Sequence, residues 1–121
     1  MRVRVWLRVG FAAAISLPAV ALGHHSASRF DLTIRDNRVS GIVKEFEVAN
    51  PHTKIVLEVT DDKGTRDIEF EGHSRNNYYR SGWRVGMVNP GDRITLIAAP
   101  TRDGSDGGYA LGVIIEDGTR F

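Results

Sequence analysis

The residues best suited to chemistry in this 121-residue chain are its four histidines, which fall at three places. His24 and His25 are adjacent, whereas His52 follows an Asn-Pro pair and His73 stands alone. If cleavage made His24 the first residue, its α-amine and imidazole could chelate Cu(II), with His25 or His52 adding a nitrogen. The other interpretation is a terminal pair and a turn histidine that bind no metal. The sequence favours this second interpretation, because it has no histidine pair at helical spacing.

A second candidate site joins the Asn-Pro-His turn to the glycine-rich segment 102–108. In an OB-fold, the loops after the first and fourth strands flank the ligand-binding face. Under that fold, both segments would border one groove for a small-molecule or peptide ligand. The alternative is structural, with the amide capping the backbone and the histidine bonding locally. The candidate ligand-binding residues are Asn50, His52, Asp103, Ser105 and Asp106.

The remaining clusters give no evidence for an enzyme. Tyr78, Tyr79 and Trp83 could stack on bases or sugars, but their helical spacing favours a plug over the core. The acidic pairs at 61–62 and 69/71 belong to a predicted turn and to a solvated strand face. The sequence contains no nucleophile–base motif, phosphate-binding glycine loop or cofactor fingerprint. We therefore expect a non-enzymatic protein whose only candidate cofactor is Cu(II).

The first 23 residues have the features of a secretory signal peptide. Three arginines precede an uncharged run over 9–22, and small residues lie at its end. The run has fourteen residues, too few for a membrane-spanning helix, which needs about 20. Cleavage after Gly23 would release a protein that begins at His24 and is not inserted in a membrane. We expect this protein to be periplasmic or secreted.

Removal of the leader also changes the charge balance. The remaining 98 residues carry 13 basic and 15 acidic side chains, a formal charge of −2. The basic character therefore belongs to the leader, and the charge predicts no nucleic-acid partner. The chain has no cysteine, so an exported domain of this size would depend on packing and hydrogen bonds without disulfides.

The rest of the chain divides into a polar arm over 24–36 and one domain over 37–121. Runs of β-forming residues predict five strands, the first of which is bent at Gly41. Ser74 is the predicted cap of a helix near 75–83, between the third and the fourth strand. This order predicts an all-β fold with one short helix, a five-stranded OB-fold-like Greek-key barrel, with a different small β-sandwich as the alternative. The expected core residues are Phe46, Ile55, Leu57, Phe70, Trp83, Ile94, Leu96, Val113 and Ile115.

Short motifs along this part of the chain resemble one family. They are His24-His25-Ser26, Phe30-Asp31, Gly41-Ile42-Val43, Asn50-Pro51-His52, Gly82-Trp83, Pro90-Gly91-Asp92, Asp103-Gly104-Ser105 and Asp117-Gly118. In order and spacing they resemble an uncharacterised family of small exported bacterial proteins, catalogued as domain of unknown function 6152. The resemblance implies export and a small β domain, and it implies no established activity.

These observations predict an exported binding or accessory protein of the cell envelope. Its ligand would lie between the His52 turn and the 102–108 loop. The alternative function is copper handling by the mature N-terminus, with His24, His25 and His52 as candidate ligands.

Overall fold

The structure is a computed structural model that describes residues 28–121. The predicted signal peptide and the histidines His24 and His25 lie outside the described residues. The elements, in chain order, are β1 (Arg38–Glu47), β2 (Thr53–Asp61), β3 (Gly64–Gly72), α2 (Arg75–Arg80), β4 (Arg93–Pro100) and β5 (Gly108–Ile114). Among residues 28–121, no helix has the length and apolar character needed to cross a membrane.

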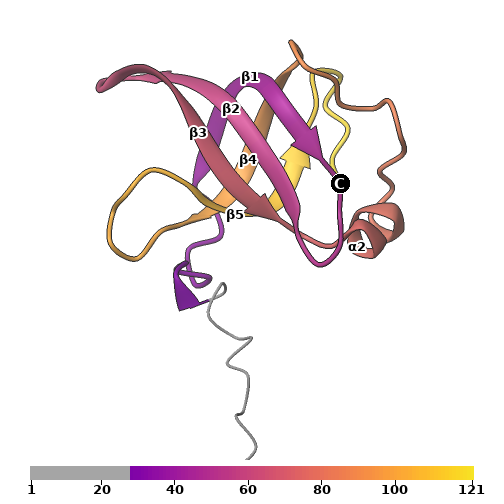
Figure 1. The fold of residues 1–121 in the computed structure, drawn as a ribbon, viewed down its shortest axis with the longest axis horizontal. Coiled ribbons are helices and arrows are strands. Elements are labelled where there is room, and N and C mark those ends of the chain that lie inside the picture. The colour runs from indigo at the N-terminus through magenta and orange to yellow at the C-terminus, as the bar shows by residue number, and fades with distance from the viewer. Residues whose placement is uncertain (1–27) are drawn as a thin grey trace, which may run out of the picture.

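The five strands close into a barrel in the order β1-β2-β3-β5-β4 (Figure 1). Long β1 pairs with β2 along one edge and with β4 along the other, and both pairings are antiparallel. Strands β3 and β5 are parallel and share one registered pair in the described part of the chain, Glu71 with Tyr109. The predicted OB-fold-like barrel with one short helix is therefore confirmed. We call the β3–β5 contact the seam.

Alternation along the strands fills the barrel. Ile55, Leu57 and Val59 of β2 are buried, as are Ile68 and Phe70 of β3. Successive side chains of a strand point to opposite faces, so these residues line the interior, while Val56, Glu58 and Glu69 between them lie on the outer face.

The rest of the core agrees with the sequence in part. Ile94, Leu96, Val113 and Trp83 are buried as expected. Phe46 and Ile115 are only half-buried against the core, which corrects their assignment. Phe46 instead packs beside the rings of Tyr78, Trp83 and Phe121. Buried aromatic residues that were not in the expected set are Phe30, Tyr78 and Phe121.

The bend of β1 differs from the prediction at Gly41. The register of β1 against β2 shifts between Val43 and Glu45, so the irregularity lies after the glycine. Gly41 has another role, since a Cβ there would lie 2.5 Å from the carbonyl oxygen of Glu58. The glycine therefore allows β1 to approach β2 closely.

The helix begins where the sequence predicts and ends early. The side chain of Ser74 caps it by accepting a hydrogen bond from the backbone N–H of Asn77. Gly82 has a φ of 105°, a left-handed conformation that favours glycine and stops the helix. Tyr78 is buried beneath the helix, as a core plug would be, whereas Tyr79 is 40% exposed.

Candidate functional site

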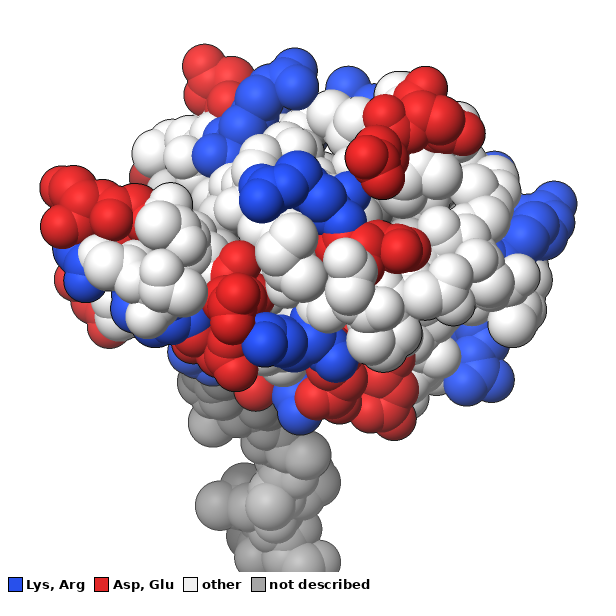
Figure 2. Space-filling model, turned by 90° about the horizontal axis from the view of Figure 1, so that it is seen from above, with Lys and Arg blue, Asp and Glu red and all other residues white. Residues whose placement is uncertain are grey.

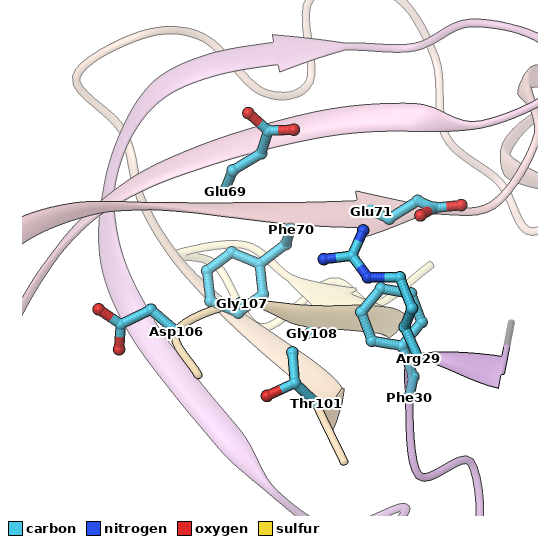
Figure 3. A pocket seen from close by; sticks show the side chains of 9 residues that line it. All are labelled: Arg29, Phe30, Glu69, Phe70, Glu71, Thr101, Asp106, Gly107 and Gly108. Carbon is cyan, nitrogen blue, oxygen red and sulfur yellow. The ribbon is translucent and has the colours of Figure 1, made fainter. Parts of the chain in front are cut away.

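A cleft of about 250 Å³ opens beside the seam (Figure 3). Its walls come from the arm, from β3 and from the segment that joins β4 to β5. The lining residues are Arg29, Phe30, Glu69, Phe70, Glu71, Thr101, Asp106, Gly107 and Gly108. The cleft is therefore built by parts of the chain that are distant in sequence.

The arm forms one wall because Phe30 anchors it to the barrel. Phe30 is 3% exposed and makes an antiparallel bridge with Thr101. The backbone N–H of Asp31 donates to the carbonyl of Pro100 (2.9 Å), and that of Arg102 donates to the carbonyl of Arg29 (2.9 Å). This short pairing places the side chain of Arg29 at the cleft, where Figure 3 shows it extending toward β3.

A glycine pair lets the opposite segment approach β3. A Cβ at Gly107 would lie 3.0 Å from the carbonyl oxygen of Glu69, and one at Gly108 would lie 2.7 Å from that of Ala99. Any larger residue would push this segment away from the barrel. The glycines that the sequence assigns to an irregular loop therefore shape one wall of the cleft.

Four polar side chains meet at the seam, and we call them the seam cluster: His52, Glu71, His73 and Tyr109. Nδ1 of His52 lies 3.2 Å from Oε1 of Glu71. The hydroxyl of Tyr109 lies 3.1 Å from Nδ1 of His73. The ring of Tyr109 also contacts both imidazoles edge to face, at 6.4 Å from His52 and 5.2 Å from His73.

Burial shifts the pKa values of two members of the cluster, His73 and Tyr109, in opposite directions. Burial lowers the pKa of His73, outweighing a hydrogen bond to the backbone of Leu111 that acts in the opposite direction. Burial, helped by the charge of Glu71, raises the pKa of Tyr109. At neutral pH His73 is therefore neutral and Tyr109 keeps its proton, so the tyrosine hydroxyl can donate to Nδ1 of the histidine.

Glu71 is the least satisfied member of the cluster. Its Oε1 atom is buried and accepts no hydrogen bond from any described residue, although His52 is close. The Glu71 side chain as a whole is 22% exposed and lines the cleft. A buried acceptor without a hydrogen bond destabilises the fold and calls for an explanation. Among the described residues, buried side-chain atoms of Thr53, Tyr78 and Trp83 also lack a hydrogen bond, but only Glu71 lines the cleft.

Asp106 lies at the other end of the cleft and is held by an arginine of β3. Nε and Nη2 of Arg66 donate to its two carboxylate oxygens at 2.6 and 2.7 Å. The Arg66 guanidinium also donates to both oxygens of Asp61, at 2.8 and 3.2 Å. We call these three residues the Arg66 corner. Arginine lowers the pKa of each aspartate, chiefly through these hydrogen bonds.

The predicted ligand-binding residues fall into three places. Asp106 lines the cleft, and His52 reaches its wall through Glu71. Asp103 and Ser105 line an adjoining cavity of about 140 Å³ that shares Arg29 and Thr101 with the cleft. Within it, the Ser105 hydroxyl donates to Asp103 at 2.6 Å in a local turn.

Asn50 lies elsewhere and has a structural contact. Its side-chain oxygen accepts a hydrogen bond of 3.0 Å from the backbone N–H of Arg75, the first residue of α2. The turn thus helps to satisfy the start of the helix. Within the Asn-Pro-His motif, His52 therefore lies toward the cleft, whereas Asn50 contacts the start of α2.

Sequence reasoning missed Arg29, Glu71, His73 and Tyr109 as members of one site. The strand pattern suggested a solvated position for Glu71, whereas one of its oxygens is buried. One signal was present: Glu71 and His73 are two residues apart at the end of a strand, a spacing that places side chains on one face.

The described residues contain no group of three or more histidine, aspartate and glutamate side chains that could hold a metal ion. Any copper site that uses His24 and His25 would involve residues outside that part of the chain. The copper hypothesis therefore stays a prediction.

Comparison with known proteins gives one positive result. No curated protein matches the chain. The model of a family of unknown function, DUF6152, matches residues 12–110. The match covers most of the chain. The chain therefore belongs to this family of unknown function, DUF6152.

Proposed function

We propose that the protein is an exported, non-enzymatic binding module that holds a small polar or peptide-like ligand in the cleft beside the seam. The observation that carries this proposal is a pair of opposite charges on two walls that the described residues bond only in part: the Arg29 guanidinium lies over the Phe30 ring, 5.6 Å from its centroid, and Glu71 has His52 at 3.2 Å. The Arg29 guanidinium has no ion pair among residues 28–121, and one carboxylate oxygen of Glu71 has no hydrogen bond there. Groups with free bonding capacity around a concave surface are what orient a bound ligand.

The surroundings of the cleft support a small ligand over a polymer. The cleft is smaller than the roughly 300–1,000 Å³ typical of sites for drug-sized molecules. On the described face in Figure 2, basic and acidic side chains lie side by side, and no extended basic patch covers it. Nucleic-acid binding requires such a patch. Export is supported by the leader-like residues 1–23, and N-terminal sequencing of the exported protein tests it.

A thermal-shift screen with amino acids, sugars, polyamines and organic acids tests the binding proposal. A ligand of the cleft should raise the melting temperature of the wild type and raise that of His52→Ala less. Glu116→Ala is the matched control, because Glu116 lines a separate cavity of about 230 Å³ formed with Met87 and Asp92. Equal stabilisation of the wild type and His52→Ala by every ligand would contradict binding at the cleft.

Copper handling is the second candidate function, and one contact at His52 favours it. The carboxylate of Glu71 lies behind Nδ1, and the side chain of His52 is 41% exposed. Metal-binding histidines commonly have a carboxylate behind one ring nitrogen while the other binds the ion. With His24 and His25, this histidine would complete a nitrogen-rich set suited to Cu(II).

Cu(II) titration of the cleaved protein tests this alternative. A version with one extra N-terminal alanine moves the free amine away from His24 and leaves every side chain in place. Binding should be tight only without the extension, and it should weaken as pH falls through about 6.5, where protons compete for imidazole. Equal affinity in both versions would contradict a chelate by the amine and imidazole of His24.

A further inference from the structure

We infer that the cleft recognises an adjacent ammonium and carboxylate, the end group of a free α-amino acid. This inference rests on the proposed binding function and names the chemistry of its ligand. It starts from Arg29 and Glu71, which line the same cleft from different walls and form no ion pair with each other. Figure 3 shows the guanidinium extending toward the part of β3 that carries Glu71.

Each of these residues suits one half of the zwitterion. The guanidinium of Arg29 can donate two parallel hydrogen bonds to a carboxylate. The carboxylate of Glu71 can accept hydrogen bonds from an ammonium group. Its Oε1 atom is buried beside His52, whereas Oε2 forms no hydrogen bond or ion pair with any described residue and is the oxygen that would bind the ligand. A ligand with one charge alone would leave the opposite group of the protein without a partner.

The other acidic residues of the cleft do not compete for the ammonium group. Asp106 is paired with Arg66 at 2.6 Å. The side chain of Glu69 points away from the interior of the cleft in Figure 3. Glu71 is thus the acid best placed to bind beside Arg29.

The remaining walls favour a small end group. Phe30 and Phe70 are 3% and 2% exposed, and they place apolar rings at the base of the cleft. The backbone at Gly107 and Gly108 lies close to β3 and restricts the width. A short aliphatic side chain could contact these rings while its charged groups lie at the rim.

Three probes separate the two charges, and nuclear magnetic resonance of the ¹⁵N-labelled protein follows them. Alanine carries both charges, N-acetylalanine lacks the ammonium, and alanine amide lacks the carboxylate. Alanine should shift the amide signals of Gly107 and Gly108 in a saturable way, with a Kd in the millimolar range. Each of the other two probes should bind at least about tenfold more weakly, a loss of about 1.4 kcal/mol.

Two variants assign the charges to residues. Glu71→Gln should weaken alanine to the affinity of N-acetylalanine, and Arg29→Gln should weaken it to the affinity of alanine amide. Arg93→Gln is the control, because Arg93 is exposed and lines a separate cavity formed with Met87 and Asp92. It should leave the affinity for alanine within about twofold.

The outcomes separate this inference from the proposed function. Equal binding of alanine and alanine amide, or of alanine and N-acetylalanine, would overturn recognition of a zwitterion while leaving a ligand in the cleft. Absence of any shift at Gly107 and Gly108 with all three probes would also overturn it. In that case the thermal-shift screen with His52→Ala still decides whether the cleft binds another class of molecule.

Discussion

Two charged residues of β3, Arg66 and Glu71, lie toward opposite ends of the strand and have very different surroundings. Arg66 donates hydrogen bonds to two carboxylates and satisfies both oxygens of each. Glu71 has one histidine within 3.2 Å and a buried oxygen that accepts no hydrogen bond from the described residues. The comparison shows that the role of a charged residue at a cleft depends on how many of its hydrogen bonds are already made within the fold. The bonds of Arg66 are used within the fold, whereas Glu71 keeps bonding capacity that the proposed ligand would use.

The largest loss of stability is expected from removing a core side chain of β3 that lies between Arg66 and Glu71. Phe70 lies between them on β3 and is 2% exposed. Phe70→Ala should lower the free energy of unfolding by about 3–5 kcal/mol, because it leaves a cavity in the core. Chemical denaturation measures this change, with Tyr79→Ala at a 40% exposed aromatic residue as control. A cost below about 1 kcal/mol would mean that β3 does not depend on this ring.

A smaller effect is expected at the Arg66 corner. Arg66→Met should lower the melting temperature of the protein at pH 7, and the difference from the wild type should decrease with added salt. Arg93→Met is the matched control, since Arg93 is an exposed strand residue that makes no ion pair with any described residue. Equal melting temperatures for Arg66→Met and the wild type at low salt would contradict a structural role for the corner.

The stability difference between Arg66→Met and the wild type should depend on pH. Arg66 holds the pKa values of Asp61 and Asp106 below their usual range near 3.9. The folded state thus favours the charged carboxylates, and this stabilisation is present above about pH 4 and lost as pH falls through the lowered pKa values. Melting curves should therefore differ most at pH 7 and converge in strong acid. A difference that grows toward low pH would give the opposite sign and contradict the pairing.

The smallest change in stability is expected from a substitution at Glu71, and its direction separates Glu71 from the Arg66 corner. Glu71→Gln should leave the free energy of unfolding at pH 8 within about 1 kcal/mol of the wild type, or raise it, because it removes a poorly satisfied buried charge. Asp106→Asn should instead lower the melting temperature by weakening the Arg66 corner. Urea denaturation of both variants checks the contrast. If Glu71→Gln were the more destabilising of the two, Glu71 would be a structural residue.

The sequence predicted the barrel well because its signals are local. Alternation marks β2 and β3, Ser74 marks the start of α2, and the turn before β4 is marked by Pro90 and Gly91. Phe30 is a single apolar residue in a polar arm and forms no hydrophobic pattern with its neighbours. Its burial against Thr101 was therefore not predictable from the sequence. A single hydrophobic residue becomes part of a core only through pairing that forms in three dimensions.

The candidate site was less predictable for a related reason. His52 and Asp106 were identified from loop chemistry, and the structure places them toward opposite ends of the cleft region. Their most informative neighbours, Glu71 and Tyr109, meet because of the register of a parallel pair. Nothing in the local sequence encodes that register, since it follows from closure of the whole barrel.

The seam also determines where the native barrel opens first. Strands β3 and β5 share one registered pair in the described residues, whereas β2 and β3 are paired over nine residues on each strand. Amide hydrogens near Tyr109 should therefore exchange with solvent through local separation of these strands, ahead of those in the β2–β3 hairpin. Because the cleft spans the same seam, a bound molecule would join its two sides. Slower amide exchange around Tyr109 would then report an occupied cleft even without knowledge of what occupies it.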